Sequence, residues 1–432
     1  MDPGEYARRI AKPNTPPPTS PVPTAAQMKM DFRLASLFPP ASGSMLLPGE
    51  SLATIKAGML RLKQLREWEM ITPPGAVDSD LLYVYVRVAS GATLENVRSE
   101  CFGVPDEMAE WSMLAGWSEE YRMLMVAALP EVLTIRLVYP PRFRTGSTTT
   151  AGDVLHHGPL ARTNFGLDGT PIPVGVISDG VTNAMMAQAS GDLPPALMIL
   201  NPGSGDEGTA MLEIIHDIAP GSPLGFHAAG TNSVAFTNAV TALATTGHKV
   251  ICDDVGWYTD PFFEQSTAGI HIANLRSVWD FIHISAAGND GRLHHQAGFN
   301  DTNPIDGWHD PILYATIPPG GVLDVFMQWN ESLNAVPASD FDLYLYDSNN
   351  LAAGPIAWST TPGVVGETIS HTNTGPTTIT AAIYVWKVSG ANRTLEIFME
   401  PQNGSSQFTN GTSAIDAVFG HPAHPAVIAV GA

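Results

Sequence analysis

Short apolar runs alternate with amphipathic segments between residues 161 and 292. The apolar runs are VGVIS, ALMIL, PLGFHAA, KVICDDVG and FIHISAAGN, and the segments between them include EGTAMLEIIHDIA, SVAFTNAVTALATT and HIANLRSVWDFI. Continuous apolar strands that alternate with helices are typical of a parallel sheet covered on both faces. Ligands bind beyond the carboxyl ends of such strands. We therefore expect the chemistry in the loops after Ile177, Val255 and Ala287.

The pattern changes to strict alternation after about Gly291. The segments GGVLDVFMQWN, DFDLYLYDS, TTITAAIYVWKV and RTLEIFME repeat with period two and are separated by turn residues. They predict an all-β sandwich over residues 293–415. Residues 416–432, which end in VIAVGA, return to the parallel-sheet pattern. The chain is thus predicted to be an α/β domain over 161–292 and 416–432, interrupted by a β insertion.

A second small unit precedes the α/β domain. LLYVYVRVAS and EVLTIRLVYP predict strands, and MAEWSMLAGW and YRMLMVAAL predict helices, which gives an α+β unit over 76–142. Residues 1–75 are rich in proline and predict a flexible leader. The Ser/Thr/Gly-rich stretch at 143–160 predicts an exposed linker, where proteolysis concentrates.

Charge and cysteine content narrow the class of protein. The chain has 21 Lys and Arg residues against 42 Asp and Glu residues, so it has no general attraction for nucleic acid or for anionic lipid. The two cysteines, Cys101 and Cys252, exclude a disulfide framework and a cysteine-based zinc site. No apolar run is long enough to span a membrane, and the first residues show no signal peptide.

Three segments, in this order, resemble the subtilisin-like serine proteases. PVGVISDG (173–180) is similar to the strand that ends in their catalytic Asp, EGTA (207–210) to their His-Gly-Thr helix with Glu in place of His, and ISAAGNDG (284–291) to the turn with the oxyanion Asn. Residues 250–256 are similar to the strand that lines the substrate cleft, and 421–432 to a later core strand. The resemblance implies a serine endopeptidase with a polypeptide substrate and a secreted or cell-envelope location. The 76–142 unit stands where these proteases carry a propeptide of similar size.

The resemblance implies roles for several residues. Asn289 would hold the oxyanion, Glu207 would act as the base and Asp179 would support Glu207. The residues implied to line the substrate cleft are Asp254, Val255, Gly256 and Gly288. Because the pKa of a free Glu carboxyl is near 4.3, a carboxylate base predicts activity at acid pH.

The match departs from the family in three places. Glu at position 207 is similar to the sedolisin branch, but the residue four positions later is Met211 and not the sedolisin Asp. Ser178 stands where subtilases usually have Asp, and Asp179 comes one residue later. The alternative for Glu207 is an acidic helix start favoured by the helix dipole, and the alternative for Asn289 is an ordinary turn. His216 lies nine residues after Glu207, so it should face the opposite side of the helix.

The nucleophile is missing from the resemblance. The only Gly-Thr-Ser match, at 411–413, precedes VIAVGA and is better explained as the exit loop of the β insertion. We therefore expect a C-terminally truncated protease. A non-catalytic pseudo-protease that binds peptides or surfaces stays open as the alternative, and an unrelated α/β binding protein is a third hypothesis.

Metal binding has weak support in the sequence. His294, His295 and His309 lack a convincing ligand spacing. The neighbouring carboxylates Asp253 and Asp254 leave calcium open as a cofactor. The strand at 340–347 resembles the signature strand of a small β-sandwich that accompanies secreted bacterial peptidases, where it would bind or stabilise.

Overall fold

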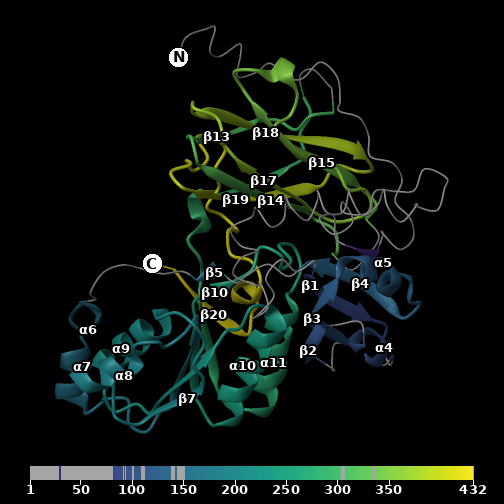
Figure 1. Ribbon diagram of the computed structural model, residues 1–432. Coiled ribbons are helices and arrows are strands. Elements are labelled where there is room, and N and C mark those ends of the chain that lie inside the picture. The colour runs from purple at the N-terminus through teal and green to yellow at the C-terminus, as the bar shows by residue number, and fades with distance from the viewer. Residues whose placement is uncertain are drawn as a thin grey trace. The chain divides into compact units, whose positions relative to one another are not determined.

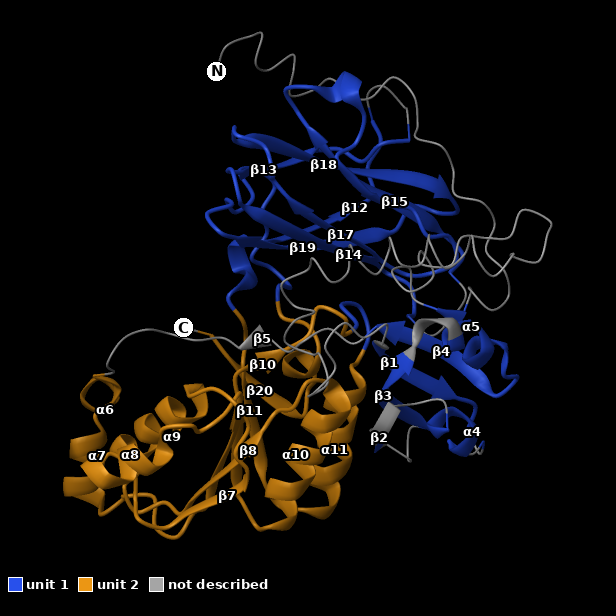
Figure 2. Cartoon of the chain, in the orientation of Figure 1, with its two compact units in different colours: residues 1–138, 261–264, 289–417 blue, residues 139–260, 265–288, 418–432 orange. Residues whose placement is uncertain are grey.

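The structure is a computed structural model that describes residues 29–30, 81–90, 92, 94–99, 102–108, 112–137, 142–143, 151–302, 307–333 and 337–431. The predicted leader lies almost wholly outside the described residues, as does the linker from 144 to 150. The chain divides into two compact units, which are described separately (Figure 2). Unit 1 comprises residues 1–138, 261–264 and 289–417, and unit 2 comprises residues 139–260, 265–288 and 418–432.

Unit 2 contains a parallel sheet of six strands in the order β20-β11-β9-β6-β8-β7 (Figure 1). Every pair of neighbouring strands in it is parallel. The strands are β6 (Val174–Ser178), β7 (Leu197–Asn201), β8 (Leu224–Ala228), β9 (Val250–Asp253), β11 (Ile282–Ala286) and β20 (Val427–Val430). The helices between them are α8 (Ala184–Ser190), α9 (Glu207–Ile218), α10 (Ser233–Thr245) and α11 (Thr267–Val278).

Helices cover both faces of this sheet. Val176 packs with Leu212 of α9, whereas the next residue along β6, Ile177, packs with Phe236 of α10 and Ile272 of α11. Successive side chains of a strand point to opposite faces, so both sets of positions must be apolar. This explains the continuous apolar runs, and the predicted α/β core is confirmed.

After the predicted β insertion, the chain adds one more strand to the parallel sheet of unit 2. Strand β20 pairs with β11 in parallel, with His283 opposite Val427 and Ala286 opposite Val430. The predicted β insertion between two strands of one α/β domain is therefore confirmed.

Part of the predicted linker is helical. Residues 152–155 form α6 (Gly152–Leu155), and α7 (Gly158–Phe165) begins inside the predicted linker. The guanidinium of Arg162 on α7 donates hydrogen bonds to both carboxylate oxygens of Asp153, at 2.8 and 2.6 Å. It also donates to the carbonyl of Ile218 at the end of α9. The linker prediction is wrong here because one arginine orders the segment, which its Ser/Thr/Gly-rich composition does not reveal.

Replacing Arg162 with alanine should lower the free energy of unfolding of unit 2, because the hydrogen bonds of its guanidinium to Asp153 and to the carbonyl of Ile218 are lost. Thermal unfolding of the full chain measures this. The control is Lys249→Ala, which removes an exposed pair with Asp280 at 3.5 Å and should change little. Equal effects of the two variants would contradict the role given to Arg162.

Unit 1 contains a β-sandwich. One sheet has the strand order β12-β19-β14-β17 and the other β13-β18-β15-β16. Their strands are β12 (His294–Gly298), β13 (Leu313–Ile317), β14 (Val322–Trp329), β15 (Asp340–Asp347), β16 (Ala357–Ser359), β17 (Glu367–Thr372), β18 (Ile379–Ser389) and β19 (Thr394–Gln402). Side chains from both sheets share one core, among them Val325, Trp329 and Ile397 from the first and Leu343 and Ile383 from the second.

Unit 1 also contains a four-stranded antiparallel sheet in the order β2-β3-β1-β4. The elements are β1 (Leu81–Val88), α4 (Glu95–Arg98), β2 (Phe102–Met108), β3 (Met113–Glu119), α5 (Glu120–Ala128) and β4 (Val132–Leu137). The helix predicted from MAEWSMLAGW is wrong, since its second half forms β3 between β1 and β2. Tyr83 lies opposite Trp117 and stacks on it at 4.7 Å, so cross-strand packing overrides the helical pattern.

Among the described residues, no helix has the length and apolarity to cross a membrane.

Candidate active site

The carboxyl ends of β6 and β9 lie at the same edge of the sheet, because the two strands are parallel neighbours. Ser178 ends β6, Asp179 comes directly after it, Asp254 follows β9, and Glu207 opens α9. The loop before α9 wraps closely around Asp179. At Gly205, where φ is +123°, an added Cβ would lie 1.9 Å from an oxygen of Asp179, so only glycine fits. Three carboxyl groups therefore gather at this edge.

Asp179 caps helix α9 from outside the helix. Its Oδ1 accepts hydrogen bonds from the backbone N–H of Glu207 at 3.0 Å and of Gly208 at 3.3 Å. Its Oδ2 accepts from the N–H of Asp206 at 3.2 Å. A carboxylate on the free N–H groups of a first helical turn is favourable. Asp179 thus fixes the start of the helix that carries Glu207, and its hydrogen bonds go to the Glu207 backbone and not to the Glu207 carboxyl.

The side chain of Glu207 is half-buried. Burial raises the pKa of its carboxyl, and the negative charge of Asp179 raises this pKa further. Glu207 therefore holds a proton at a higher pH than a free glutamate does. A raised pKa is the direction expected of a carboxyl that accepts a proton and returns it during a reaction.

Asp254 is only 6% exposed. Its Oδ2 accepts a hydrogen bond from the hydroxyl of Ser178 at 3.1 Å, and its Oδ1 is buried with no hydrogen-bond partner among the described residues. Burial raises the pKa of Asp254 to about 7, and the charges of Asp253 and Glu207 contribute. The predicted cleft residue is thus a buried carboxyl whose proton affinity is set partly by Glu207.

The predicted cleft strand is already paired. Val255 and Gly256 form β10, which pairs in antiparallel fashion with β5 (Arg142–Phe143). This edge of unit 2 therefore accepts an extended segment of polypeptide backbone. Gly288 has a φ of +98°, and Asn289, the first residue of unit 1 after β11, is exposed and makes no side-chain capping hydrogen bond.

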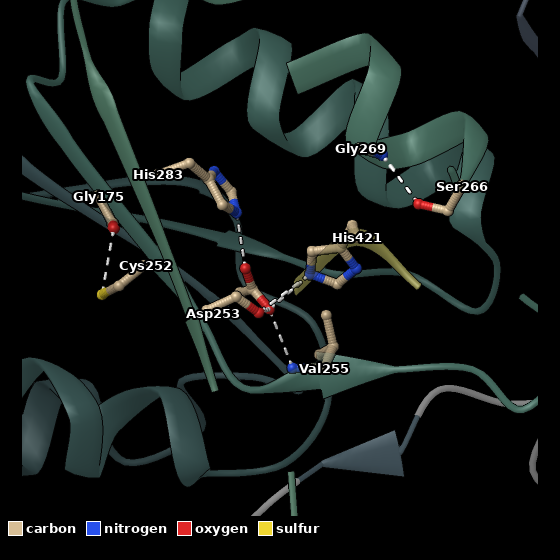
Figure 3. A network of polar contacts seen from close by, with 9 residues as sticks. Gly175, Cys252, Asp253, Val255, Ser266, Gly269, His283 and His421 are labelled. Atoms are coloured by element: carbon tan, nitrogen blue, oxygen red, sulfur yellow. Dashed lines mark hydrogen bonds and ion pairs between the residues drawn. The ribbon is translucent and has the colours of Figure 1, made fainter. Parts of the chain in front are cut away.

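A second polar cluster lies in the core of unit 2 (Figure 3). The imidazoles of His283 and His421 point at the carboxylate of Asp253, with Nε2–O distances of 2.7 and 3.0 Å. The hydroxyl of Ser285 donates to the same carboxylate at 2.8 Å. Burial raises the pKa of Asp253, but the two histidines outweigh it and hold this pKa below its usual range. The sequence resemblance did not identify this cluster.

The cluster has the residue types of a serine-protease triad without its geometry. A triad histidine contacts serine through Nε2 and aspartate through Nδ1. Here the Nε2 of His421 faces both Ser285, at 3.1 Å, and Asp253. Ser285 is 1% exposed, so no substrate reaches its hydroxyl. The cluster is a structural network that ties β9, β11 and the segment before β20 together.

The same residues also resemble a metal site. One ligand atom each from Asp253, His283 and His421 lies within 4.8 Å of the others. Metal-bound imidazoles usually donate their second N–H to an acceptor, but the Nδ1 atoms of both histidines have no hydrogen-bond partner in the part of the chain that the structure describes. Calcium takes oxygen ligands, so a site with two imidazole nitrogens does not suit it. The geometry fits Nε2–H groups that donate to Asp253.

The remaining sequence candidates lie elsewhere. His216 is on the last turn of α9, and its Nδ1 is buried without a hydrogen-bond partner among the described residues. His294 and His295 contact the exit loop of the sandwich. The Nδ1 atom of His294 lies 2.8 Å from the carbonyl oxygen of Ser413, and the Nδ1 atom of His295 lies 2.5 Å from that of Gly411. The backbone N–H of Ser413 donates to His294, which places Ser413 in unit 1.

Comparisons with known proteins give partial structural likeness. No family model matches the chain, and no curated protein does. Among solved structures, the CspB protease of Clostridium perfringens is 15% identical and has a TM-score of 0.38, with 59% of this chain and 67% of that chain covered. The epidermin leader peptide processing serine protease (EpiP) of Staphylococcus aureus is 15% identical and has a TM-score of 0.33, with 49% and 61% covered. Identities and TM-scores this low leave the function to be argued from the site.

Proposed function

We propose that unit 2 is the core of a serine endopeptidase of the subtilisin-like kind in which Glu207 takes the place of the usual histidine base. The observation that carries this proposal is the pairing of β10 with the chain's own residues 142–143, beside Asp254. An extended substrate that adds to β10 in the same way would gain main-chain hydrogen bonds. Its backbone would then run along the strand end that carries a titratable carboxyl.

The reaction follows from this placement. A serine hydroxyl attacks the substrate carbonyl carbon, its proton passes to the Glu207 carboxylate, and the carbonyl oxygen becomes an oxyanion. The side-chain amide of Asn289 is the proposed oxyanion donor. Glu207 then returns the proton to the leaving amine as the C–N bond breaks, and water hydrolyses the acyl-enzyme. Asp179 keeps Glu207 in place through the first turn of α9. In the proteases that the chain resembles, the nucleophilic serine opens a helix after the strand equivalent to β20.

The test is hydrolysis of an unfolded protein substrate by the full-length gene product between pH 3 and pH 8. Glu207→Gln should lower kcat by about 10²–10⁴-fold, because the proton acceptor is lost. Glu213→Gln, on the same helix, is the matched control and should retain activity. Full activity of Glu207→Gln, or an activity profile centred well above neutral pH, would refute the assignment.

One observation favours a second function. Among the described residues, no serine hydroxyl hydrogen-bonds to the Glu207 carboxyl. A pseudo-protease that binds extended peptides along β10 without cleaving them fits this arrangement. If the full-length gene product binds unfolded polypeptide in a titration but hydrolyses none at any pH, the binding function replaces the catalytic one.

A further inference from the structure

We infer that residues 419–421, which lead into β20, hold β10 in place, and that His421 is a positioning residue for this strand. The inference deepens the proposed function and rests on it for its catalytic meaning, because β10 is the strand on which that function places the substrate. The support of β10 is itself a property of unit 2 that can be measured without any assay of peptide cleavage.

The position of β10 has to come from contacts outside its own sheet. Among the described strands, β10 pairs with β5 in a sheet of two strands that is separate from the six-stranded sheet. Each of the two strands has only two residues. A two-stranded pair is marginally stable by itself even when it is longer. Side chains packed around β10 must therefore fix it.

The carboxylate of Asp253 connects His421 to the first residue of β10 (Figure 3). Its Oδ1 accepts a hydrogen bond from the backbone N–H of Val255 at 3.2 Å and lies 3.0 Å from Nε2 of His421. Its Oδ2 faces His283 instead, at 2.7 Å. The two histidines are therefore not equivalent, because only His421 shares its oxygen atom with the backbone of β10.

Aromatic packing connects His421 to the other end of β10. Trp257 follows β10 directly and is 1% exposed. The centroid of its ring lies 6.3 Å from that of His421. Both rings also pack on Phe236 of α10, at 5.5 Å for Trp257 and 4.5 Å for His421. His421 is thus linked to both ends of the strand.

The two residues before His421 pack against the rest of the loop that leaves β10. Phe419 stacks on Tyr258, with 5.4 Å between the ring centroids and 21° between the ring planes. Gly420 has a φ of +70°, and an added Cβ would lie 2.9 Å from Oδ2 of Asp260, so glycine is favoured there. Three consecutive residues, 419–421, therefore lie along the loop 257–260.

The consequence for the proposed reaction concerns binding more than chemistry. A substrate that pairs with a loosely held strand must also order that strand, and this cost weakens the affinity. Glu207, the proposed base, is held separately through the hydrogen bonds of Asp179 to the first turn of α9. Loss of the contacts at 419–421 should therefore raise KM for a polypeptide substrate and change kcat little.

The decisive experiment is hydrogen–deuterium exchange of the full chain, followed by mass spectrometry of peptides that cover residues 254–260. His421→Ala should make this stretch exchange about tenfold faster, because local opening becomes easier. His283→Ala is the matched control. It also removes one hydrogen bond to Asp253, but from Oδ2, so it should lower the melting temperature and leave exchange at 254–260 nearly unchanged.

A second variant tests the same segment outside the hydrogen-bonded network. Phe419→Ala removes the stack on Tyr258 and should also speed exchange at 254–260. In a protein that hydrolyses casein, this variant should raise KM by about tenfold and change kcat by about twofold or less. If far-ultraviolet circular dichroism shows that His421→Ala does not fold, Phe419→Ala decides.

The outcomes separate the support of β10 from the proposed function. Equal exchange at 254–260 in the wild type and in folded His421→Ala and Phe419→Ala variants overturns the inference, even if the protein is an active protease. The same holds if His283→Ala speeds exchange there as much as His421→Ala does. Faster exchange in the two test variants of a protein that neither binds nor cleaves casein supports the inference and refutes the proposed function.

Discussion

Replacing Asp253 with alanine should cost unit 2 about 3–5 kcal/mol of its free energy of unfolding. Asp253 is 3% exposed and accepts hydrogen bonds from His283, His421, Ser285 and the backbone N–H of Val255. The substitution leaves all four donors buried without an acceptor, and each unsatisfied group costs free energy. Urea unfolding followed by circular dichroism measures the loss.

The control for this prediction is Asp280→Ala. Asp280 is fully exposed and pairs with Lys249 at 3.5 Å, so its removal should leave the stability almost unchanged. If Asp253→Ala unfolds at the same urea concentration as this control, the network of buried hydrogen bonds does not support unit 2.

The β-sandwich should lose stability as the pH rises from about 4 to about 7. Burial raises the pKa of Asp342 from 3.8 to about 7, and burial together with the charge of Asp342 raises the pKa of Glu367 well above 4.5. Because the folded-state pKa values are the higher ones, the folded protein binds protons that the unfolded chain releases. The stabilisation is complete below the unfolded values and is lost as the pH passes through the folded ones. Melting temperatures between pH 4 and pH 8 measure it.

Glu367→Gln should flatten this pH dependence and raise the melting temperature of the sandwich at pH 8. The glutamine stays neutral, and its amide remains able to hydrogen-bond with Ser359 and with the N–H of Thr361, the partners of Glu367. Asp347→Asn, at the end of β15, serves as the control. A wild-type melting temperature that rises with pH over this range would contradict the assignment.

Hydrophobic patterning predicted the architecture well, because the inner strands of the parallel sheet, such as β6 and β8, are buried along almost their whole length. It did not predict the strand order, which places β7 at the edge beyond β8. It failed at residues 113–117, where small and apolar residues suit a helix and a central strand equally well, and only pairing with β1 decides between them. The linker prediction failed since the ordering contact joins Arg162 to α9, far along the chain.

The candidate site was partly predictable. The rule that ligands bind at strand ends pointed to Asp179 and Asp254, which lie directly after β6 and β9, and the resemblance added Glu207; their roles stay predictions. The Asp253 network was missed because Asp253 and His421 are 168 residues apart. A signal was present, since Asp253, His283 and Ser285 interrupt apolar strand runs at positions that the period-two pattern points inward. Charged and polar residues in such runs need partners, and only the fold shows which residues supply them.

Hydrogen bonds join the two ends of the β-sandwich insertion, and this affects how the chain folds and how it can be engineered. The entry and exit of the insertion are joined by the Ser413 N–H bond to His294 at 2.9 Å and by the His295–Gly411 bond. Once the sandwich has folded, it therefore bridges β11 and β20 as a short connector does, with little of the loop-closure entropy that an unfolded segment of its length would impose. The insertion behaves as an exchangeable module, so a short Gly/Ser loop in its place should still let β20 join the sheet.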